Sequence, residues 1–287
     1  MHYPNLPTLL TEAKSTLRKG PIALVLVEDN TEVVSTVKHH VKLGFTQVIM
    51  FCSPEFTLSE DLPSNAHRVD FDVTADGALQ SILNGIMKAA PGQWVYYCYN
   101  AEYLFFPFCE TRSIGEVTGF MSEERRNSIM SYTVDLYAHD LGAHPDGVDL
   151  QNAFFDRTGY YALARQDKDG EALDRQLDIF GGLRWRFQEH IALPRQRLDS
   201  VSLIRSVTGV TMDKDRNLSD PEMNTVSCPW HNNLTAATLS FRTAKALCRN
   251  PGSKDQIGSF YWENSERFNW HSQQLLDLGL IEPGQWF

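Results

Sequence analysis

The chain has 287 residues, and its 26 Lys and Arg against 36 Asp and Glu give a formal charge of −10 at pH 7. Apolar residues make up 42% and charged residues 22%, which excludes intrinsic disorder as the main state and allows one large domain or two modest ones. An acidic chain without a Lys/Arg stripe also argues against nucleic acid and anionic membrane as partners, because both attract local positive charge.

No targeting signal is visible at the N-terminus. The start, MHYPNLPTLL, lacks the cationic residues and the apolar core of a signal peptide, and no apolar run is long enough to span a bilayer. We therefore predict no transmembrane segment and a cytoplasmic location, with a peripheral position at the inner membrane as the alternative. The five cysteines include no CxxC pair, which predicts reduced thiols.

The first hundred residues alternate between apolar runs and amphipathic segments. Asp29 to Thr31 offers a helix N-cap directly after the first apolar run, and valines at helical spacing follow up to Gly44. The predicted elements are strands at 22–28, 46–51, 68–73 and 94–99 and helices at 33–41 and 77–90. This βαβ pattern predicts an α/β fold with an open, mostly parallel twisted sheet and helices on both faces.

The periodicity weakens beyond residue 103. We expect a strand-like aromatic run at 103–108, extended segments over 114–137, long loops or an insertion over 138–178, a strand pair at 198–212, and helices at 234–248 and 270–280. The economical prediction is one domain whose first half covers residues 20–110 and whose loop-rich C-terminal half covers 111–287.

Parallel sheets bind ligands at the carboxyl ends of their strands, so the residues at those positions are candidates. They are Glu28, Asp29 and Asn30 after the first strand, Cys52, Ser53, Pro54 and Glu55 after the second, and Tyr99, Asn100, Ala101 and Glu102 after the fourth. None of these segments is a glycine-rich phosphate loop, which argues against Rossmann dehydrogenases and P-loop enzymes.

Several segments, in order, resemble motifs of the family 2 glycosyltransferases, in the bacterial glycosyltransferase-like family 2 branch. The matching segments are VKHHVKLGF at 37–45 (family W-x-x-H-H-x-x-L-G-F), WVYYCYNAEYL at 94–104 (W, an apolar strand, then D-A-D-E-F-L), FGGLRWRF at 180–187 (G-G-x-R-x-R-x-F) and LDSVSLIR at 198–205 (L-x-K-x-P-L-V-R). His231 stands where the family has H-Y-x-x-[KR]-S, and FYWEN at 260–264 is similar to a C-terminal Tyr-Trp segment. The resemblance covers residues 20–110 and 178–268.

The resemblance implies a GT-A fold that transfers a sugar from a nucleotide-sugar donor to an acceptor hydroxyl, in bacterial polysaccharide or glycoconjugate synthesis with a glycan or lipid-linked acceptor. In that family a D-x-D motif holds a divalent cation that neutralises the departing nucleoside diphosphate. Here the two aspartates fall on Tyr99 and Ala101, and a shift by one residue leaves Asn100 and Glu102. The sequence is compatible both with a retained Mn²⁺ or Mg²⁺ site and with the loss of this site.

Other family positions differ as well. The first strand end, [KR]-N-E in the family, is Val27-Glu28-Asp29, and the D-N-x-S after the second strand is residues 52–55, CSPE. After His231 the family's Tyr, Lys/Arg and Ser become Asn232, Thr235 and Ala236. Either the donor is unusual or catalysis has been lost, so the alternative function is a catalytically inactive GT-A-like domain that binds a glycan or a protein.

The candidate site residues follow from these matches. We predict donor binding by Glu28, Asp29, Asn30, Ser53, Tyr99, Arg184 and Arg186, metal binding by Asn100, Glu102 and His231, and catalysis by Asp178, Glu189 and His231, with Asp156 as a further candidate base. The two arginines would replace a metal in holding the diphosphate. Structural alternatives are an N-cap for Asp29, a salt bridge for Arg184, and packing for His39 and His40. A metal-dependent hydrolase using His139, His144 and Asp146 is the weakest alternative.

Overall fold

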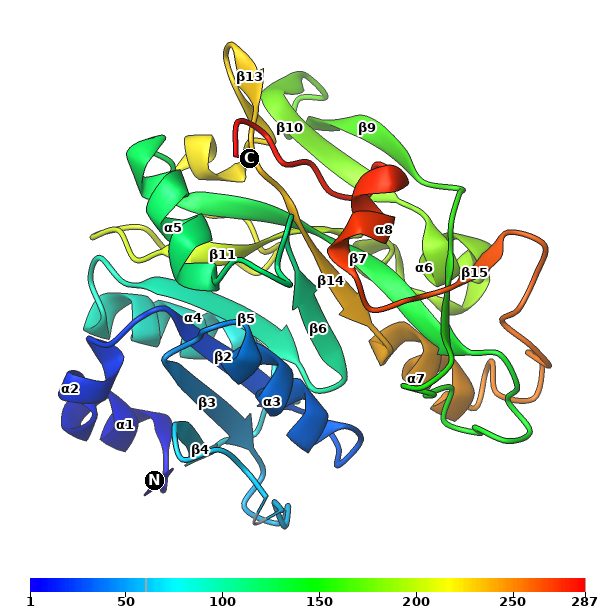
Figure 1. Ribbon diagram of the computed structural model, residues 1–287, viewed down its shortest axis with the longest axis horizontal. Coiled ribbons are helices and arrows are strands. Elements are labelled where there is room, and N and C mark those ends of the chain that lie inside the picture. The colour runs from blue at the N-terminus through cyan, green and yellow to red at the C-terminus, as the bar shows by residue number, and fades with distance from the viewer. Residues whose placement is uncertain (60, 287) are drawn as a thin grey trace. The chain divides into compact units, whose positions relative to one another are not determined.

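A computed structural model describes residues 1–59 and 61–286 and shows an α/β protein with a large mixed sheet (Figure 1). The chain forms two compact units. Unit 1 comprises Met1–Tyr103, Thr111–Met130 and Val201–Asn224, and unit 2 comprises Leu104–Glu110, Ser131–Ser200 and Thr225–Phe287. The chain passes from one unit to the other within β6 (Glu102–Phe105), β7 (Ser128–Ala138) and β11 (Asp199–Arg205).

Unit 1 is built on a parallel sheet. Its further strands are β1 (His2–Tyr3), β2 (Ile22–Val27), β3 (Gln47–Cys52), β4 (Ala66–Asp70) and β5 (Trp94–Tyr99). Its helices are α1 (Leu6–Glu12), α2 (Lys14–Leu17), α3 (Val33–Lys42), α4 (Ala78–Ala89), α5 (Ile114–Glu123) and the 3₁₀ helix η3 (Pro221–Asn224). The strand order is β1-β4-β3-β2-β5-β11, in which β1 to β5 are parallel and β11 is antiparallel to β5.

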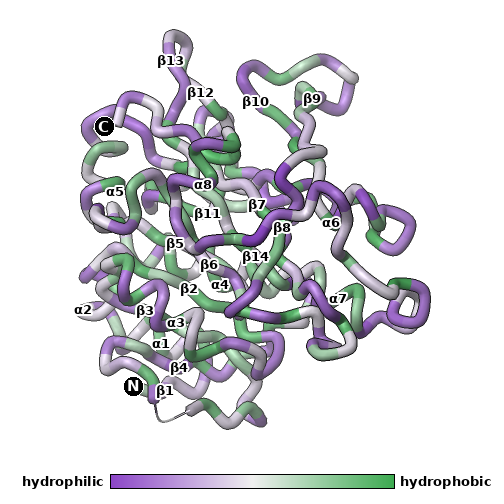
Figure 2. The backbone as a smooth tube through the Cα atoms, turned by 45° about the vertical axis from the view of Figure 1, so that its right-hand side comes forward, coloured by the Kyte–Doolittle hydropathy of each residue, from purple (hydrophilic) through white to green (hydrophobic). Residues whose placement is uncertain are grey.

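Strand β2 is the centre of this unit. All six of its residues, IALVLV, are buried, and Leu24 pairs with Ile49 of β3 on one side and Tyr97 of β5 on the other. A strand buried on both faces needs a cover on each, and α3 and α4 supply it (Figure 1). The hydropathy colouring of Figure 2 is correspondingly hydrophobic along β2. The strands predicted at 22–28, 46–51 and 94–99 and the two helices are confirmed, whereas the strand predicted at 68–73 is β4, which ends at Asp70.

The order of these strands identifies the edge of the sheet at which a ligand is expected. From β2 the chain moves outward to β3 and β4 and then returns to the other side of β2 as β5. The carboxyl ends of β2 and β5 therefore flank the point where the strand order reverses, which is where open parallel sheets bind ligands. Asp29 and Asn100 follow these two strand ends.

The start of α3 differs from the expected one. Its N-cap is Glu32, with a left-handed φ of 55°, and no side chain caps the helix. The expectation that Asp29 to Thr31 forms the cap is wrong, because Asp29 Oδ1 accepts the backbone N–H of Thr31 at 2.9 Å and closes a turn before the helix.

Unit 2 is more irregular. Its further strands are β8 (Ala153–Asp156), β9 (Tyr161–Gln166), β10 (Ala172–Phe180), β12 (Ser227–Cys228), β13 (His231–Asn232), β14 (Ala236–Ser240) and β15 (Ser265–Arg267). Its helices are α6 (Gly182–Arg186), α7 (Arg242–Arg249), α8 (Ser272–Asp277) and the 3₁₀ helices η1 (Gln188–His190) and η2 (Leu193–Arg195). Strand β7 pairs in parallel with β14 and antiparallel with β8, while β9–β10 and β12–β13 are separate antiparallel pairs.

Several expectations for the second half are wrong. The segment expected to be extended from residue 114 begins with helix α5, whose capping box joins Ser113 and Glu116. The expected loop region 138–178 contains β8, β9 and most of β10. Strand β8 has only four residues, and β9 and β10 are largely exposed or half-buried, so none of the three shows a clear alternation of apolar and polar residues.

The C-terminal helices are also shorter than expected. Residues 234–248, expected to form one helix, contain strand β14 followed by helix α7, and the helix expected at 270–280 is reduced to α8. The strand pair expected at 198–212 is the single strand β11 followed by a turn region. Among the described residues, no helix combines the length and apolarity needed to cross a membrane. All five cysteines are free thiols, as expected.

His40 shows how the sheet-facing side of α3 is built. The ring is fully buried, its Nδ1 lies 2.8 Å from the Thr36 carbonyl oxygen, and it packs on Tyr96 with 5.1 Å between ring centroids. Burial, with a smaller contribution from the neighbouring His39, lowers the pKa of His40 to about 3. The expectation that this histidine packs in the core is confirmed.

The depressed pKa makes folding stability dependent on pH. The unfolded chain binds a proton at His40 below about pH 6.5 and the folded chain does not, so stability falls as pH decreases from about 6.5 toward 3. We expect His40 alone to cost about 2 kcal/mol between pH 7 and pH 5. Urea unfolding at both pH values should show this loss in the wild type and in His39→Gln but not in His40→Phe. An equal loss in His40→Phe would contradict the assignment.

Candidate functional site

The loops after β2 and β5 are joined by one buried carboxamide. Asn100 Nδ2 donates to Asp29 Oδ1 at 2.7 Å and to the Thr31 carbonyl at 2.8 Å, while its Oδ1 accepts the Glu28 N–H at 2.9 Å. The side chain is fully buried. The structure therefore brings together the predicted residues Glu28, Asp29 and Asn100, and they hold one another in place at the carboxyl edge of the sheet.

The turn after β5 is held in a similar way. Glu102, buried to 7% exposure, accepts the Tyr99 N–H on Oε2 at 2.7 Å. Ala101 has a left-handed φ of 61°, and its N–H donates to Thr36 Oγ1 at 2.9 Å. A non-glycine residue in this conformation costs free energy, which these hydrogen bonds offset. The segment aligned with the family's D-x-D is thus fixed by contacts with its own chain.

These residues do not form a cation site as they stand. The Asn100 oxygen points to the Glu28 N–H, and the Glu102 carboxylate to the Tyr99 N–H. Within residues 1–59 and 61–286, no group of three His, Cys, Asp or Glu side chains that could hold a metal ion is found. A divalent cation stays a prediction, and we derive no chemical step through it.

A pocket of about 300 Å³ lies beside this edge, after β2 and β3. It is lined by Asn30, Glu32, Val33, Val34, Ser35, Thr57, Leu58 and Ser59. Of the predicted donor-binding residues, Asn30 belongs to this lining. We refer to it as the α3 pocket, because four of its lining residues are the N-cap and first turn of α3.

The second wall of the α3 pocket is the segment that follows β3. Arg68 of β4 shapes this segment by donating to the Phe56 carbonyl at 2.7 Å and the Ser53 carbonyl at 3.1 Å. Lys38 of α3 also contacts Asp61 at 2.5 Å. Ser53, predicted to bind the donor, is not one of the lining residues; its carbonyl accepts Arg68, and its hydroxyl accepts the Glu55 N–H at 3.4 Å.

The lining of the α3 pocket combines polar side chains with Val33, Val34 and Leu58, and it includes no Lys or Arg. Glu32 Oε2 accepts the Ser35 hydroxyl at 2.5 Å, and that hydroxyl also lies 2.9 Å from the Tyr103 hydroxyl. Because no side chain caps α3, the backbone N–H groups of its first turn supply the positive end of the helix dipole at this wall. The pocket therefore offers hydroxyls, one carboxylate and helix amides.

In unit 2 the predicted Arg186 is part of a buried ion pair. Its Nε and Nη2 donate to the two oxygens of Asp156 at 2.8 and 3.0 Å, and its guanidinium lies 4.9 Å from the Trp262 ring centroid. Asp156 also accepts the Tyr137 hydroxyl at 2.6 Å and the Trp262 indole N–H at 2.8 Å. Asp156, a candidate base, and Arg186, a candidate donor ligand, therefore pair with each other inside unit 2 and contact the aromatic side chains around them.

Arg184 is engaged in the same unit. Its Nε lies 3.5 Å from Asp135 Oδ1, and its Nη1 donates to the Arg197 carbonyl at 2.6 Å. Asp135 is buried, and burial raises the pKa of its carboxyl group while the Arg184 guanidinium opposes that shift. Arg184 thus forms the structural salt bridge that we gave as the alternative to donor binding. Sequence reasoning missed Asp135, which lies within an apolar strand and carries no motif.

The two glycines before these arginines have a steric role. A Cβ on Gly181 would lie 2.5 Å from Tyr160 Cδ1 and 2.9 Å from the Gly159 carbonyl, and one on Gly182 would lie 3.2 Å from Asp135 Oδ2. Both residues also have positive φ angles, 152° and 59°. The paired glycines therefore permit close packing against β7 and the residues before β9.

The predicted catalytic residues of unit 2 lie in different surroundings. Asp178 accepts Arg165 Nε at 2.7 Å and lies 3.1 Å from Arg197 Nε. Glu189 is exposed and 3.6 Å from the ring of the adjacent His190. His231 lies in the β12–β13 pair, where its Nε2 is 3.0 Å from Cys228 Sγ. None of these contacts joins two of the three predicted residues.

The residues of the hydrolase alternative have separate partners too. His139 packs on Tyr261, with 4.4 Å between ring centroids, and His144 lies 3.3 Å from Asp149 Oδ2. Asp146 Oδ1 accepts the Val148 N–H at 3.1 Å. These three side chains therefore stabilise local turns and packing.

Comparison with known proteins adds no identification. No family model matches the chain, and no curated protein matches it. The resemblance to the family 2 glycosyltransferases stays a prediction from the motifs.

The Asp156–Arg186 pair gives a stability prediction. Arg186→Met leaves a buried carboxylate without its guanidinium, and we expect it to lower the free energy of unfolding by about 3–5 kcal/mol. Arg186→Lys keeps the charge but loses the two-pronged geometry, so its loss should be smaller. Urea unfolding of both variants, with the exposed Arg195→Met as control, measures these values. Equal stability of Arg186→Met and the control would exclude a structural role for the pair.

Proposed function

We propose that this protein is a glycosyltransferase that binds a nucleotide-sugar donor in the α3 pocket of unit 1 and transfers the sugar to an acceptor hydroxyl. The observation that carries the proposal is the position of this pocket, at the carboxyl edge of a parallel sheet and against the uncapped first turn of α3. Both features favour oxygen-rich anionic ligands. The ordered motif resemblance supports the same class of donor.

The lining suits the parts of such a donor. The hydroxyls of Ser35, Thr57 and Ser59 can exchange hydrogen bonds with the hydroxyls of a ribose or sugar, and the Glu32 carboxylate can accept from them. The first-turn N–H groups of α3 can donate to phosphate oxygens. Transfer requires the negative charge on the leaving nucleoside diphosphate to be stabilised, and these amides are the donors that the pocket provides.

Arg184 and Arg186 do not contribute to the donor site that we propose in the α3 pocket. Their guanidinium groups lie against Asp135 and Asp156, and the cost of leaving those buried carboxylates unpaired is high. Phosphate binding then depends on helix amides rather than on mobile cations. Because the protein carries a net charge of −10, added salt should screen its repulsion of the anionic donor.

Titration calorimetry with UDP, GDP and their glucose conjugates, with and without Mn²⁺, tests donor binding. We expect a complex with at least one nucleotide, and we expect Val34→Trp, which fills the α3 pocket, to weaken it at least about tenfold. Lys42→Trp, a matched change on the exposed end of the same helix, should bind as the wild type does. Absence of binding to every nucleotide under both conditions would refute the proposal.

The salt dependence separates amides from arginines as the phosphate ligands. We expect the affinity for UDP to be maintained or to increase as ionic strength rises to the physiological range. If Arg184 and Arg186 held the diphosphate, affinity would decrease with salt, since released counterions oppose binding to mobile cations. The same calorimetric titration at two NaCl concentrations shows whether the UDP affinity rises or falls with salt. A neutral nucleoside, whose binding should not depend on salt, serves as the reference.

A second candidate function is a catalytically inactive GT-A-like domain that binds a glycan or a protein. It is favoured by Tyr99 and Ala101 at the positions aligned with the aspartates, and by the internal hydrogen bonds of Asn100 and Glu102. Release of nucleoside diphosphate from a bound sugar donor distinguishes the two. Turnover by the wild type that is lost in Val34→Trp excludes the inactive candidate, and binding without turnover across acceptors favours it.

A further inference from the structure

A second pocket, of about 320 Å³, lies within unit 2 beside helix α7. It is lined by Leu141, Gly142, Pro145, Leu247, Cys248, Lys254 and Ile257. We refer to it as the α7 pocket. Its volume is at the lower end of the range for small-molecule sites, about 300–1,000 Å³, which fits one short chain or ring.

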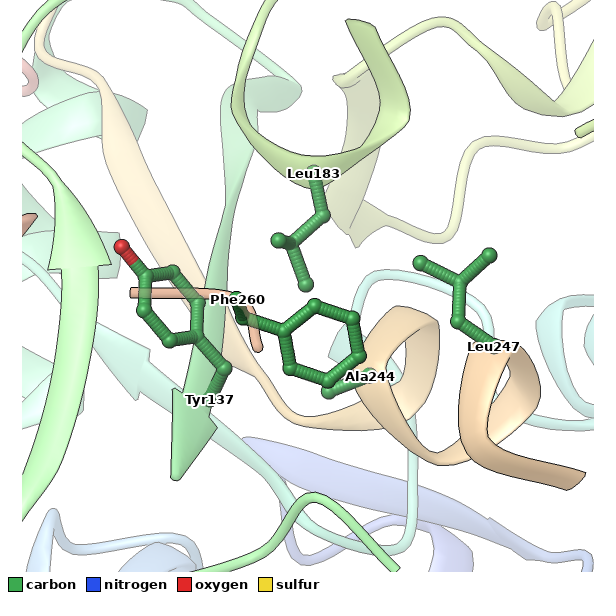
Figure 3. Close-up of a cluster of buried hydrophobic side chains, with 5 residues drawn as sticks. All are labelled: Tyr137, Leu183, Ala244, Leu247 and Phe260. Atoms are coloured by element: carbon green, nitrogen blue, oxygen red, sulfur yellow. The ribbon is translucent and has the colours of Figure 1, made fainter. Parts of the chain in front are cut away.

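The walls of the α7 pocket continue the hydrophobic core of unit 2. Leu247 belongs to a buried cluster with Tyr137, Leu183, Ala244 and Phe260, and Figure 3 shows it on the same helix as Ala244 with Leu183 nearby. The lining residues Leu141, Cys248 and Ile257 are partly buried and pack against this cluster. An apolar ligand in the pocket would therefore extend the core and remove these side chains from water.

Next to the pocket, the segment before β8 packs closely on α7. A Cβ on Gly147 would lie 3.1 Å from Ala244 Cβ and 3.2 Å from Cys248 Sγ, so the backbone before β8 packs directly on α7. Burial raises the pKa of the Cys248 thiol to about 11, with a further contribution from Asp146, so this thiol on α7 is neutral at physiological pH. The pocket is thus preformed between two packed segments.

The charge at the pocket comes from Lys254. This residue is exposed, its backbone N–H donates to the Asn250 carbonyl at the end of α7, and within the described part of the chain its ammonium has no carboxylate partner. The other charged groups around Cys248 are Asp146 and Arg249. In a protein with a net charge of −10, an unpaired ammonium beside a pocket lined by Leu141, Leu247 and Ile257 offers local positive charge to an anion.

From this combination we propose that the α7 pocket binds an amphipathic small molecule, with its short apolar chain against Leu141, Leu247 and Ile257 and its carboxylate or phosphate head at Lys254. The site lies in unit 2 and is independent of the nucleotide site proposed in unit 1. No covalent step is involved. The chemistry is that of an alkyl or acyl anion, whether its head is a fatty carboxylate or the phosphate of a lipid-like alcohol.

Four compounds with an eight-carbon chain, called the octyl compounds below, test the proposal by calorimetry on the full chain: octanoate, octyl phosphate, octylamine and octanol. We expect the two anions to bind the wild type and the cationic octylamine to bind at least about fivefold more weakly. The order of octanoate and octyl phosphate identifies the head group. Equal binding of octanoate and octylamine, or no binding of any octyl compound, would overturn the proposal.

Two pairs of variants locate the site. Lys254→Glu should weaken octanoate about fivefold and leave octanol unchanged, whereas Lys168→Glu, the same charge change on the exposed β9–β10 turn, should leave both unchanged. Ile257→Trp should fill the pocket and abolish binding of all octyl compounds, while Leu163→Trp on exposed β9 should not. Identical effects of the two members of either pair would contradict the proposal. UDP binding by the same variants remains a separate measurement of the unit 1 site.

Discussion

The complete burial of β2 on both faces is the constraint on which unit 1 depends. A parallel strand with no exposed residue needs parallel neighbours on both edges and a helix over each face, and β3, β5, α3 and α4 meet that need. Polar side chains are then confined to the strand ends. The buried Asn100 side chain bonds the backbone of Glu28 and Thr31 and the carboxylate of Asp29 simultaneously, and the α3 pocket forms next to it.

Unit 2 has a different constraint: its interior contains buried carboxylates whose charge must be compensated. Asp156 is compensated by a two-pronged guanidinium, a phenol and an indole, whereas Asp135 has one guanidinium at 3.5 Å. Buried ion pairs add little net stability, but the loss of one partner is costly. The positive charge of Arg184 and Arg186 is accordingly used inside the protein, and the two anion sites that we propose rely instead on helix amides and on Lys254.

The sequence was most informative where burial was most complete. The apolar runs of β2, β3 and β5 and the repeating valines of α3 were sufficient to predict the parallel half. Ser113 and Glu116 carried a capping-box signal that would have identified α5. Short strands such as β8 and β14 have too few residues for a period to be recognised, and their pairing depends on chain segments that are distant in sequence.

The contacts of the candidate site residues were likewise predictable from sequence in part only. Glu28, Asp29 and Asn100 could be grouped because strand ends of a parallel sheet meet, a property of topology. The partners of Arg184, Arg186 and Asp178 could not be predicted, because ion pairing inside a folded unit depends on side-chain positions that no spacing rule encodes. A basic motif read from sequence cannot tell a guanidinium that faces a ligand from one that faces a buried aspartate.

The packing at Gly181 limits what mutagenesis can reveal about the FGGLRWRF segment. Any side chain there meets the Gly159 carbonyl and the Tyr160 backbone as well as the Tyr160 ring, so truncation of that tyrosine would not make enough room. An alanine scan would record a functional loss at this glycine even if no ligand came near it. Glycines of this kind in a motif therefore report a constraint on the backbone conformation. Whether the segment binds a ligand has to be tested at the neighbouring side chains.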